Sequence, residues 1–297
     1  MRSGHVALLG WTNVGKSTLL NRLVGEKIAA VADVPQTTRH RITGVLSLPG
    51  RGQIVFVDTP GFHQPRERMN RAMVGASRET IGAVDLALVV VDAERGLGRG
   101  DAEVAKMVTA AKVPALCVLN KIDRVAPKTR LLDLMKTAVD DLGLAEAIPV
   151  SAATGDGCEV LIERILHHLP EADPPFPDDF LTDQPVRALA AEWVREKLLH
   201  RTREEIPHAA AVIVERWVER ADGVVEIEAT IFVERDSQKG IVIGKGGALL
   251  KQVGIEARAD IERLLERRVF LTTRVEVRPD WRNDPRVLAQ LGITGTG

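Results

Sequence analysis

Gly10-Trp-Thr-Asn-Val-Gly-Lys-Ser17 is the stretch that decides the fold of this chain. It matches the pattern G-x-x-x-x-G-K-[ST], and it lies between an apolar run and a helical pattern, as this motif requires. Backbone amides of such a glycine loop, and of the helix that follows, offer unsatisfied donors to a phosphate chain. We predict that Lys16 reaches the terminal phosphates and that Ser17 binds Mg²⁺. The flanking strand and helix disfavour the alternative, a chance glycine turn.

Around this motif, short apolar runs alternate with helical patterns from residue 4 to about residue 170. That alternation is typical of a parallel sheet covered by crossover helices. The sequence therefore predicts an α/β domain over residues 1–170, with a mixed, mostly parallel sheet. The expected strands are 5–10, 42–48, 53–58, 86–92, 114–120 and 147–151, and the expected helices include 16–24, 101–111 and 160–169.

Four prolines fall within eight positions in Pro170-Glu-Ala-Asp-Pro-Pro-Phe-Pro177, a density that prevents a helix or a central strand. We therefore predict a linker over 171–184 and a second domain over 185–297. The pattern changes there to two-residue alternation, which is typical of strands that are covered on one face. This α+β domain is expected to contain a helix at 186–200 and strands at 212–218, 225–233 and 269–277.

Asn120-Lys-Ile-Asp123 indicates a guanine nucleotide. It ends an apolar strand, where a carboxylate can accept hydrogen bonds from the ring N–H and the exocyclic amine of guanine, a pair that adenine lacks. A buried carboxylate that finds no hydrogen-bond partner is costly, so such a site rejects ATP. This selectivity argues against a small-molecule P-loop kinase. Ser151-Ala152, after the next strand, fits the loop whose backbone amide contacts the guanine oxygen. For the Asn-Lys-Ile-Asp run alone, the alternative is a turn with a solvated charge.

Two segments between these motifs are expected to sense the third phosphate. In Asp58-Thr-Pro-Gly61, after an apolar strand, Asp58 would hold Mg²⁺ directly or through water, and the Gly61 amide would contact the phosphate. In the preceding loop, Gln36-Thr-Thr-Arg39, we expect Thr38 to bind Mg²⁺, with Thr37 as its rival. Hydrolysis would release both segments. By themselves the threonines would suit a solvent-facing loop equally well.

The composition limits the classes of partner. Forty Lys and Arg stand against forty-one Asp and Glu, so any nucleic acid must be bound by a local basic patch. Cys117 and Cys158 lie far apart and lack metal-ligand spacing, which argues against a disulfide framework or a cysteine zinc site. Neither a secretory signal nor a long apolar run is apparent, so we expect a cytoplasmic protein and leave a peripheral membrane contact open.

Gly244-Lys-Gly-Gly247 fits the GxxG loop of a KH domain, which clamps the backbone of a single-stranded nucleic acid. The predicted order of helix, strand, strand, helix, helix, strand agrees with the type II topology of that domain. Lys239, Lys245 and Lys251 fall in a stretch without acidic residues, from 237 to 255, and supply a local positive patch. The alternative is a helix-capping turn with solvated lysines. The RNA-binding residues predicted here are Gly244, Lys245, Gly246, Gly247, Lys239 and Lys251.

Together, these motifs resemble the translation-factor-related GTPases of the Era and tRNA-modification branch. Ile206-Pro207, Val242-Ile-Gly-Lys-Gly-Gly247 and Gly254-Ile-Glu-Ala-Arg258 resemble the Era family more specifically, and the resemblance covers nearly the whole chain. Trp11 departs from the Arg or Lys expected at its position.

The resemblance implies a GTP- and GDP-binding switch that hydrolyses GTP with Mg²⁺. It also implies binding to the 3′ end of 16S ribosomal RNA and a role in assembly of the 30S subunit, and we expect a monomer. A passive RNA chaperone, in which nucleotide is structural and turnover incidental, is the alternative. The expected catalytic residues are Lys16, Ser17, Thr38, Asp58 and Gly61, and the expected GTP-binding residues are Gly10, Trp11, Thr12, Asn13, Val14, Gly15, Lys16, Ser17, Thr18, Asp58, Gly61, Asn120, Lys121, Asp123, Ser151 and Ala152.

Phe62 follows Gly61 directly. An apolar side chain cannot orient an attacking water as glutamine does in many GTPases, so intrinsic hydrolysis is expected to be slow. The resemblance to relatives with an asparagine equivalent to Asn13 implies K⁺ as a second cation, in place of the charge of an arginine finger.

Overall fold

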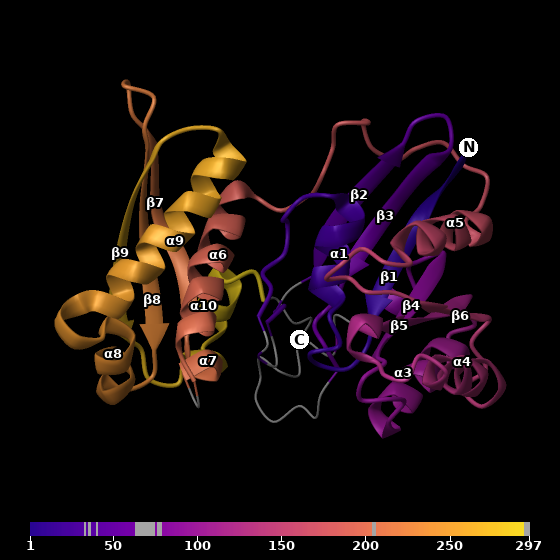
Figure 1. Cartoon of the computed structure of the whole chain (residues 1–297). Helices are drawn as coiled ribbons and strands as arrows, with labels where there is room; N and C mark the ends of the chain where they lie inside the picture. Colours follow the sequence, from indigo (N-terminus) through magenta and orange to yellow (C-terminus); the bar gives the residue numbers. More distant parts are fainter. Residues whose placement is uncertain are drawn as a thin grey trace.

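The computed structural model describes residues 1–32, 34, 37–39, 41–62, 75, 79–203 and 206–293. A six-stranded sheet is built from the first half of the chain and a three-stranded sheet from the second, each with its own helices (Figure 1). An α/β domain followed by an α+β domain was expected from the sequence, and this fold class is confirmed.

The first sheet has the strand order β2-β3-β1-β4-β5-β6, and all neighbours are parallel except β2 and β3. β1 begins at Arg2, before the expected position 5, because Arg2 and Ser3 continue the pairing with Gly52 and Gln53. Parallel strands end at one edge of a sheet, so the loops after β1, β3, β4 and β5 meet there. The strands are β1 (Arg2–Leu9), β2 (Ile42–Leu48), β3 (Gly52–Asp58), β4 (Leu86–Asp92), β5 (Ala115–Asn120) and β6 (Glu146–Pro149).

Helices cover both faces of this sheet. On one face, α1 (Lys16–Val24) and α5 (Cys158–His168) pack against alternate strand residues such as Leu8 and Phe56. On the other face, α3 (Arg99–Ala110) and α4 (Arg130–Asp140) pack against the intervening residues, Leu9 and Val89 among them. Because successive strand residues point to opposite faces, the near-continuous apolar runs of the sequence supply both cores.

The segment between the two domains contains no helix or strand from residue 169 to residue 185, as its prolines predict. It is nevertheless held against the first sheet by specific hydrogen bonds. The Val45 N–H donates to the Leu181 carbonyl at 2.8 Å, and the Thr182 hydroxyl donates to the Thr43 carbonyl at 2.6 Å. This segment therefore follows the edge strand β2 before it enters the second domain.

The second sheet has the order β7-β8-β9, with β7 and β8 antiparallel and β8 and β9 parallel. The long helices α6 and α9 cover one face, where Val194 and Val253 pack against Ile231. Near one end of the other face, Trp281 and the short helix α10 cover Phe232. The elements are α6 (Val186–Arg201), α7 (Ile206–Ala209), β7 (Ala211–Glu219), β8 (Val225–Val233), α8 (Asp236–Ile243), α9 (Ala248–Leu265), β9 (Val269–Val277) and α10 (Pro285–Gln290).

The loop after α1 joins the two domains. The Val31 N–H donates to Glu196 of α6 at 2.9 Å, and Lys27 lies 2.7 Å from the same carboxylate. Arg195 of α6 donates to the Thr37 carbonyl. Further along, Arg39 donates to the Ala210 carbonyl at 2.8 Å. Of the helices in the described ranges, none is long and apolar enough to cross a bilayer.

Candidate functional site

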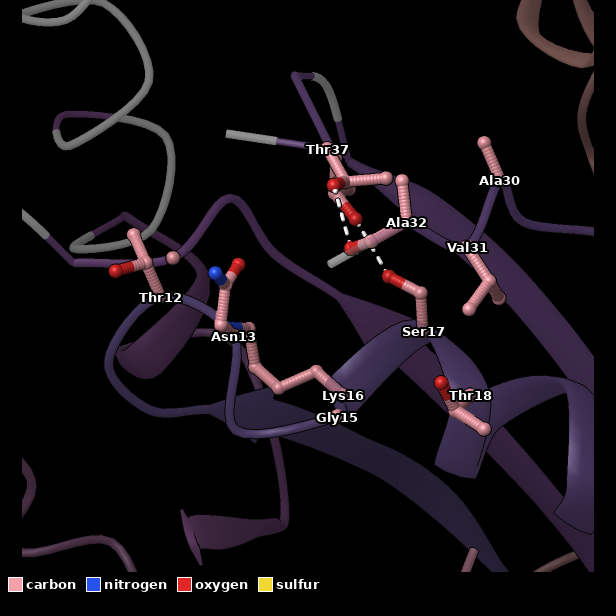
Figure 2. A pocket seen from close by; sticks show the side chains of 12 residues that line it. Thr12, Asn13, Gly15, Lys16, Ser17, Thr18, Ala30, Val31, Ala32 and Thr37 are labelled. Carbon is pink, nitrogen blue, oxygen red and sulfur yellow. Dashed lines mark hydrogen bonds between the residues drawn. The ribbon is translucent and has the colours of Figure 1, made fainter. Parts of the chain in front are cut away.

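The glycine loop lies at the carboxyl end of β1 and leads into α1. Gly15, just before the helix, has a φ of 94°, and a Cβ atom there would lie 2.3 Å from the Asn120 side chain. A side chain at this position would both strain the backbone and collide, so glycine is required. Figure 2 shows Thr12, Asn13, Lys16, Ser17 and Thr18 lining the pocket beside this loop, with Thr37 on the opposite wall.

Lys16 is buried, with 7% of its surface exposed. Its ammonium donates to the carbonyl oxygens of Gly10 and Trp11 at 3.2 and 3.0 Å. Burial lowers the pKa of Lys16 to about 8, and the Asp58 carboxylate opposes that shift. Burial likewise raises the pKa of Asp58, against the effects of Lys16 and neighbouring hydroxyls. Within the described residues this ammonium has carbonyl dipoles as its hydrogen-bond partners, so it would gain from a phosphate, which carries full charge.

Three oxygen-bearing side chains converge beside Lys16. The Ser17 hydroxyl lies 2.6 Å from the Thr38 hydroxyl and donates to the Asp58 carboxylate at 2.8 Å. The Thr38 hydroxyl reaches the same Asp58 oxygen at 3.2 Å, while the other Asp58 oxygen is buried without a hydrogen-bond partner among the described residues. The Thr37 hydroxyl instead donates to the Ala32 and Val34 carbonyls. Gln36, in the same predicted loop, lies outside the described residues.

The Gly61 backbone lies against the glycine loop. A Cβ atom on Gly61 would lie 3.1 Å from Thr12 and 3.2 Å from the Lys16 ammonium, so a larger residue would crowd the lysine. The next side chain, Phe62, is only 4% exposed and packs into the core on the α3 side of the sheet. Its N–H donates to the Gly10 carbonyl at 3.2 Å. Phe62 is therefore directed into the domain rather than toward a phosphate.

The residues expected to bind the base gather at the ends of β5 and β6. The Ser151 hydroxyl donates to the Asp123 carboxylate at 2.6 Å, and 30% of the Asp123 side chain is exposed. The Asn120 amide donates to the Val14 carbonyl at 2.9 Å and accepts from the Ala152 N–H at 3.0 Å. Asn120 thus connects the glycine loop to the loop after β6. The Ala152 amide is predicted to contact the guanine oxygen, but in this conformation it donates to the Asn120 side chain.

Two residues that the motifs did not identify hold this end of the site in place. Asp92, at the end of β4, lies 2.7 Å from the Lys121 ammonium, which also donates to the Asn13 carbonyl at 2.7 Å. Arg22 of α1 donates to the Ala152 carbonyl at 3.0 Å and to the Ala153 carbonyl at 2.6 Å. Asp92 could have been noticed as a carboxylate at a strand end. Nothing in the local sequence distinguishes Arg22 from other helical arginines.

In the second domain, residues 244–247 connect α8 to α9 as a tight turn. Gly244 and Gly246 have φ values of 74° and 59°, in the left-handed region that favours glycine. Lys245 and Lys251 are exposed and Lys239 is half-buried, so all three side chains reach the surface. A Cβ atom on Gly246 would meet nothing within 4 Å, which leaves open space over the loop.

Family models match both domains. Residues 5–121 match the model described as 50S ribosome-binding GTPase, and residues 205–282 match the KH domain. Among solved structures, Era in complex with MgGDPNP and nucleotides 1506–1542 of 16S ribosomal RNA is 38% identical, with a TM-score of 0.96 and 99% of each chain covered. A variant of Aquifex aeolicus Era bound to GDP and aluminium fluoride has the same identity and TM-score, over 99% of this chain and 100% of that one.

Curated relatives agree with these matches over the full length. GTPase Era of Geobacter metallireducens is 49% identical over 294 residues, covering 99% of this chain and 98% of the relative. GTPase Era of Heliobacterium modesticaldum is 47% identical over 293 residues, covering 99% and 97%. With such similarity from end to end, and with a GTPase domain followed by a KH domain, the chain belongs to the GTPase Era family.

Proposed function

We propose that this GTPase binds the 3′ end of 16S ribosomal RNA through its KH domain and uses GTP hydrolysis to time its part in 30S subunit assembly. The observation that carries the proposal is the convergence of Ser17, Thr38 and Asp58 beside Lys16, at the same sheet edge as Asp123 and Ser151. One end of this edge suits phosphates and the other suits guanine. The relative solved with an RNA fragment supports the choice of RNA.

The proposed roles follow from these positions. Lys16 and the amides of the glycine loop bind the phosphates, and the Gly61 amide contacts the terminal one. Asp123, oriented by the Ser151 hydroxyl, accepts from the two guanine donors. For the Ala152 amide to reach the guanine oxygen, it would share its hydrogen with Asn120 or turn away from it. The proposed GTP-binding set is otherwise the one expected from the sequence.

Mg²⁺ fits the cluster of Ser17, Thr38 and Asp58, and a relative was solved with it. Magnesium prefers oxygen ligands, and here two hydroxyls and one carboxylate lie within 3.2 Å of one another. The other Asp58 oxygen, which is buried with no hydrogen-bond partner in the described part of the chain, is further support, because leaving such an atom unpaired is costly. When bound, the ion neutralises charge that develops on the phosphates. Thr38 can join it only while the loop bearing Thr37 and Thr38 stays in place.

Slow intrinsic hydrolysis remains our expectation, because the buried Phe62 side chain cannot position a water. We also keep K⁺ as the proposed second cation, with Asn13 as its side-chain ligand. Asn13 lines the phosphate pocket and has a φ of 61°. The Lys121 ammonium donates to the Asn13 carbonyl, so the side-chain amide oxygen of Asn13 is the group proposed to bind the cation.

RNA binding is proposed for residues 244–247 together with Lys239, Lys245 and Lys251. The described part of the second domain has few aromatic residues: Trp193 and Trp281 are at least 98% buried, and the ring with the largest exposure is Phe270 of β9, at 55%. Base stacking on exposed rings therefore contributes little, and clamping of the backbone by the turn is the main source of affinity. The domain division 1–170, 171–184 and 185–297, the monomeric state, a cytoplasmic location and an occasional peripheral membrane contact belong to the same proposal.

GTP hydrolysis by the full chain, measured with and without a 3′-end 16S oligonucleotide in K⁺ and in Na⁺ buffers, tests the proposal. We expect faster turnover in K⁺ and a response to RNA. Lys245→Asp combined with Gly246→Asp should abolish RNA binding while GTP binding persists, because both positions face open space. Lys136→Asp, on α4, is the matched control.

Unchanged RNA affinity in the double variant would count against the KH assignment. Equal turnover in both cations, with and without RNA, would remove the K⁺ proposal. If the single-turnover rate of GTP hydrolysis is the same with and without RNA, the result would favour the alternative, a passive RNA chaperone in which the nucleotide is structural.

A further inference from the structure

A second cavity lies where the start of α6, strand β7 and the end of the described chain come together. Its volume is about 460 Å³, within the range of small-molecule sites. Most of its wall is apolar, with Val212 and Val214 from β7 and Leu291 from the turn after α10. Arg41, just before β2, lines it from the first domain, so both domains contribute to this site.

Two guanidinium groups line this cavity without partners among the described residues. Arg41 and Arg187 are both exposed, and in the described part of the chain neither side chain makes a hydrogen bond or ion pair. Most arginines nearby are engaged: Arg195 contacts Glu192 and the Thr37 carbonyl, and Arg39 contacts backbone carbonyls. Paired arginines do not attract an anion strongly, whereas two unpaired ones at one cavity do.

The remaining polar groups define the ligand further. Glu192 is the acidic residue of the lining, and its carboxylate is occupied by Arg195 at 3.0 Å, so it does not cancel the two free charges. The Gln290 side chain is exposed and makes no hydrogen bond within the described residues, so its amide is available to pair with the polar edge of a ligand. Aliphatic side chains can contact the faces of a flat ring. An anion on a heterocyclic body matches all three features.

We infer that this cavity binds one nucleotide unit, with its phosphate on Arg41 and Arg187 and its base between the aliphatic wall and Gln290. The source is either a nucleotide of bound single-stranded RNA or a free mononucleotide, since both present the same phosphate and base. None of these residues belongs to the GTP pocket or to the 244–247 turn, so the inference does not depend on the roles proposed there.

Calorimetric titration of the full chain with CMP, in saturating GDP and Mg²⁺, tests the free-nucleotide arm. CMP lacks the donor pair that guanine offers Asp123, so it does not compete for the GTP pocket. We expect saturable binding at one site, weakened about tenfold or more in the double variant Arg41→Gln, Arg187→Gln. The matched control is Arg130→Gln, Arg268→Gln, two exposed arginines whose side chains also lack partners in the described residues.

Fluorescence anisotropy with a 3′-end 16S oligonucleotide tests the RNA arm in the same proteins. A loss of about tenfold in the Arg41, Arg187 variant, absent from the control, identifies RNA as the source. A loss confined to CMP identifies a free nucleotide. The inference is overturned if neither affinity changes, or if the control variant loses as much. Thermal melting of all variants should coincide, because the substitutions remove no hydrogen bond or ion pair among the described residues.

Discussion

Asp123→Asn is the most informative single substitution in the nucleotide pocket. The Asp123 carboxylate is held by the Ser151 hydroxyl at 2.6 Å, which fixes its orientation before a ligand arrives. Guanine would donate two hydrogen bonds to this charged group, each worth about 1.5 to 3 kcal/mol. Because 30% of the side chain is exposed, we use the lower value for each, about 3 kcal/mol in total.

That loss corresponds to a GDP affinity reduced by about 100-fold. Asparagine keeps one acceptor oxygen but presents an N–H donor where the guanine amine also donates. One of the two hydrogen bonds to guanine is therefore replaced by a donor–donor repulsion. Xanthine carries a carbonyl in place of that amine, so the variant should bind xanthosine diphosphate better than GDP. Displacement of a fluorescent guanine nucleotide measures both constants. Asp140→Asn, an exposed carboxylate of α4, is the control and should leave both unchanged.

A variant that retained GDP affinity within about threefold would show that Asp123 does not bind the base. Loss of affinity for both nucleotides alike would point to a collapsed loop instead. Ser151→Ala separates these cases. It should weaken GDP binding by about 0.5 to 1.5 kcal/mol, because the Asp123 carboxylate is no longer oriented by the Ser151 hydroxyl, and it should leave selectivity for guanine intact.

Three further predictions concern other parts of the molecule. Arg22→Ala should lower GDP affinity about three- to tenfold, because the 152–153 loop loses two hydrogen bonds, and unchanged affinity in the displacement assay would contradict this. The pKa of Lys16 is lowered to about 8, so ligand-free protein loses this proton near that pH and bound phosphates would restore it. GDP binding should therefore take up a proton and weaken from about pH 7 to about pH 9, and a flat calorimetric affinity would refute the assignment. Trp281→Ala should reduce the free energy of unfolding by about 3 to 5 kcal/mol, since the ring is 1% exposed and its N–H donates to the Ala209 carbonyl. A change in urea denaturation below about 1 kcal/mol would show that the tail does not stabilise the domain.

The elements that the sequence predicted best are those with a strong local signal. The helix beginning at Lys16 and the strands 42–48, 86–92 and 225–233 have the bounds expected from their apolar runs and periodicity. Strand ends were less accurate: β6 runs over Glu146–Pro149 rather than 147–151. Its end is set by pairing with β5, because Pro149 faces Leu119 and the chain then turns toward Asp123.

The sequence by itself determined the chemistry of the site, because the glycine loop and the Asn-Lys-Ile-Asp run are contiguous and each lies where a strand ends. Tertiary structure alone brought Ser17, Thr38 and Asp58 together, directed Thr37 elsewhere, and paired Asp92 with Lys121. It also placed Arg41 and Arg187 at one cavity from two domains. Contacts between residues far apart in the chain depend on how whole elements pack, and neither periodicity nor local spacing carries that information.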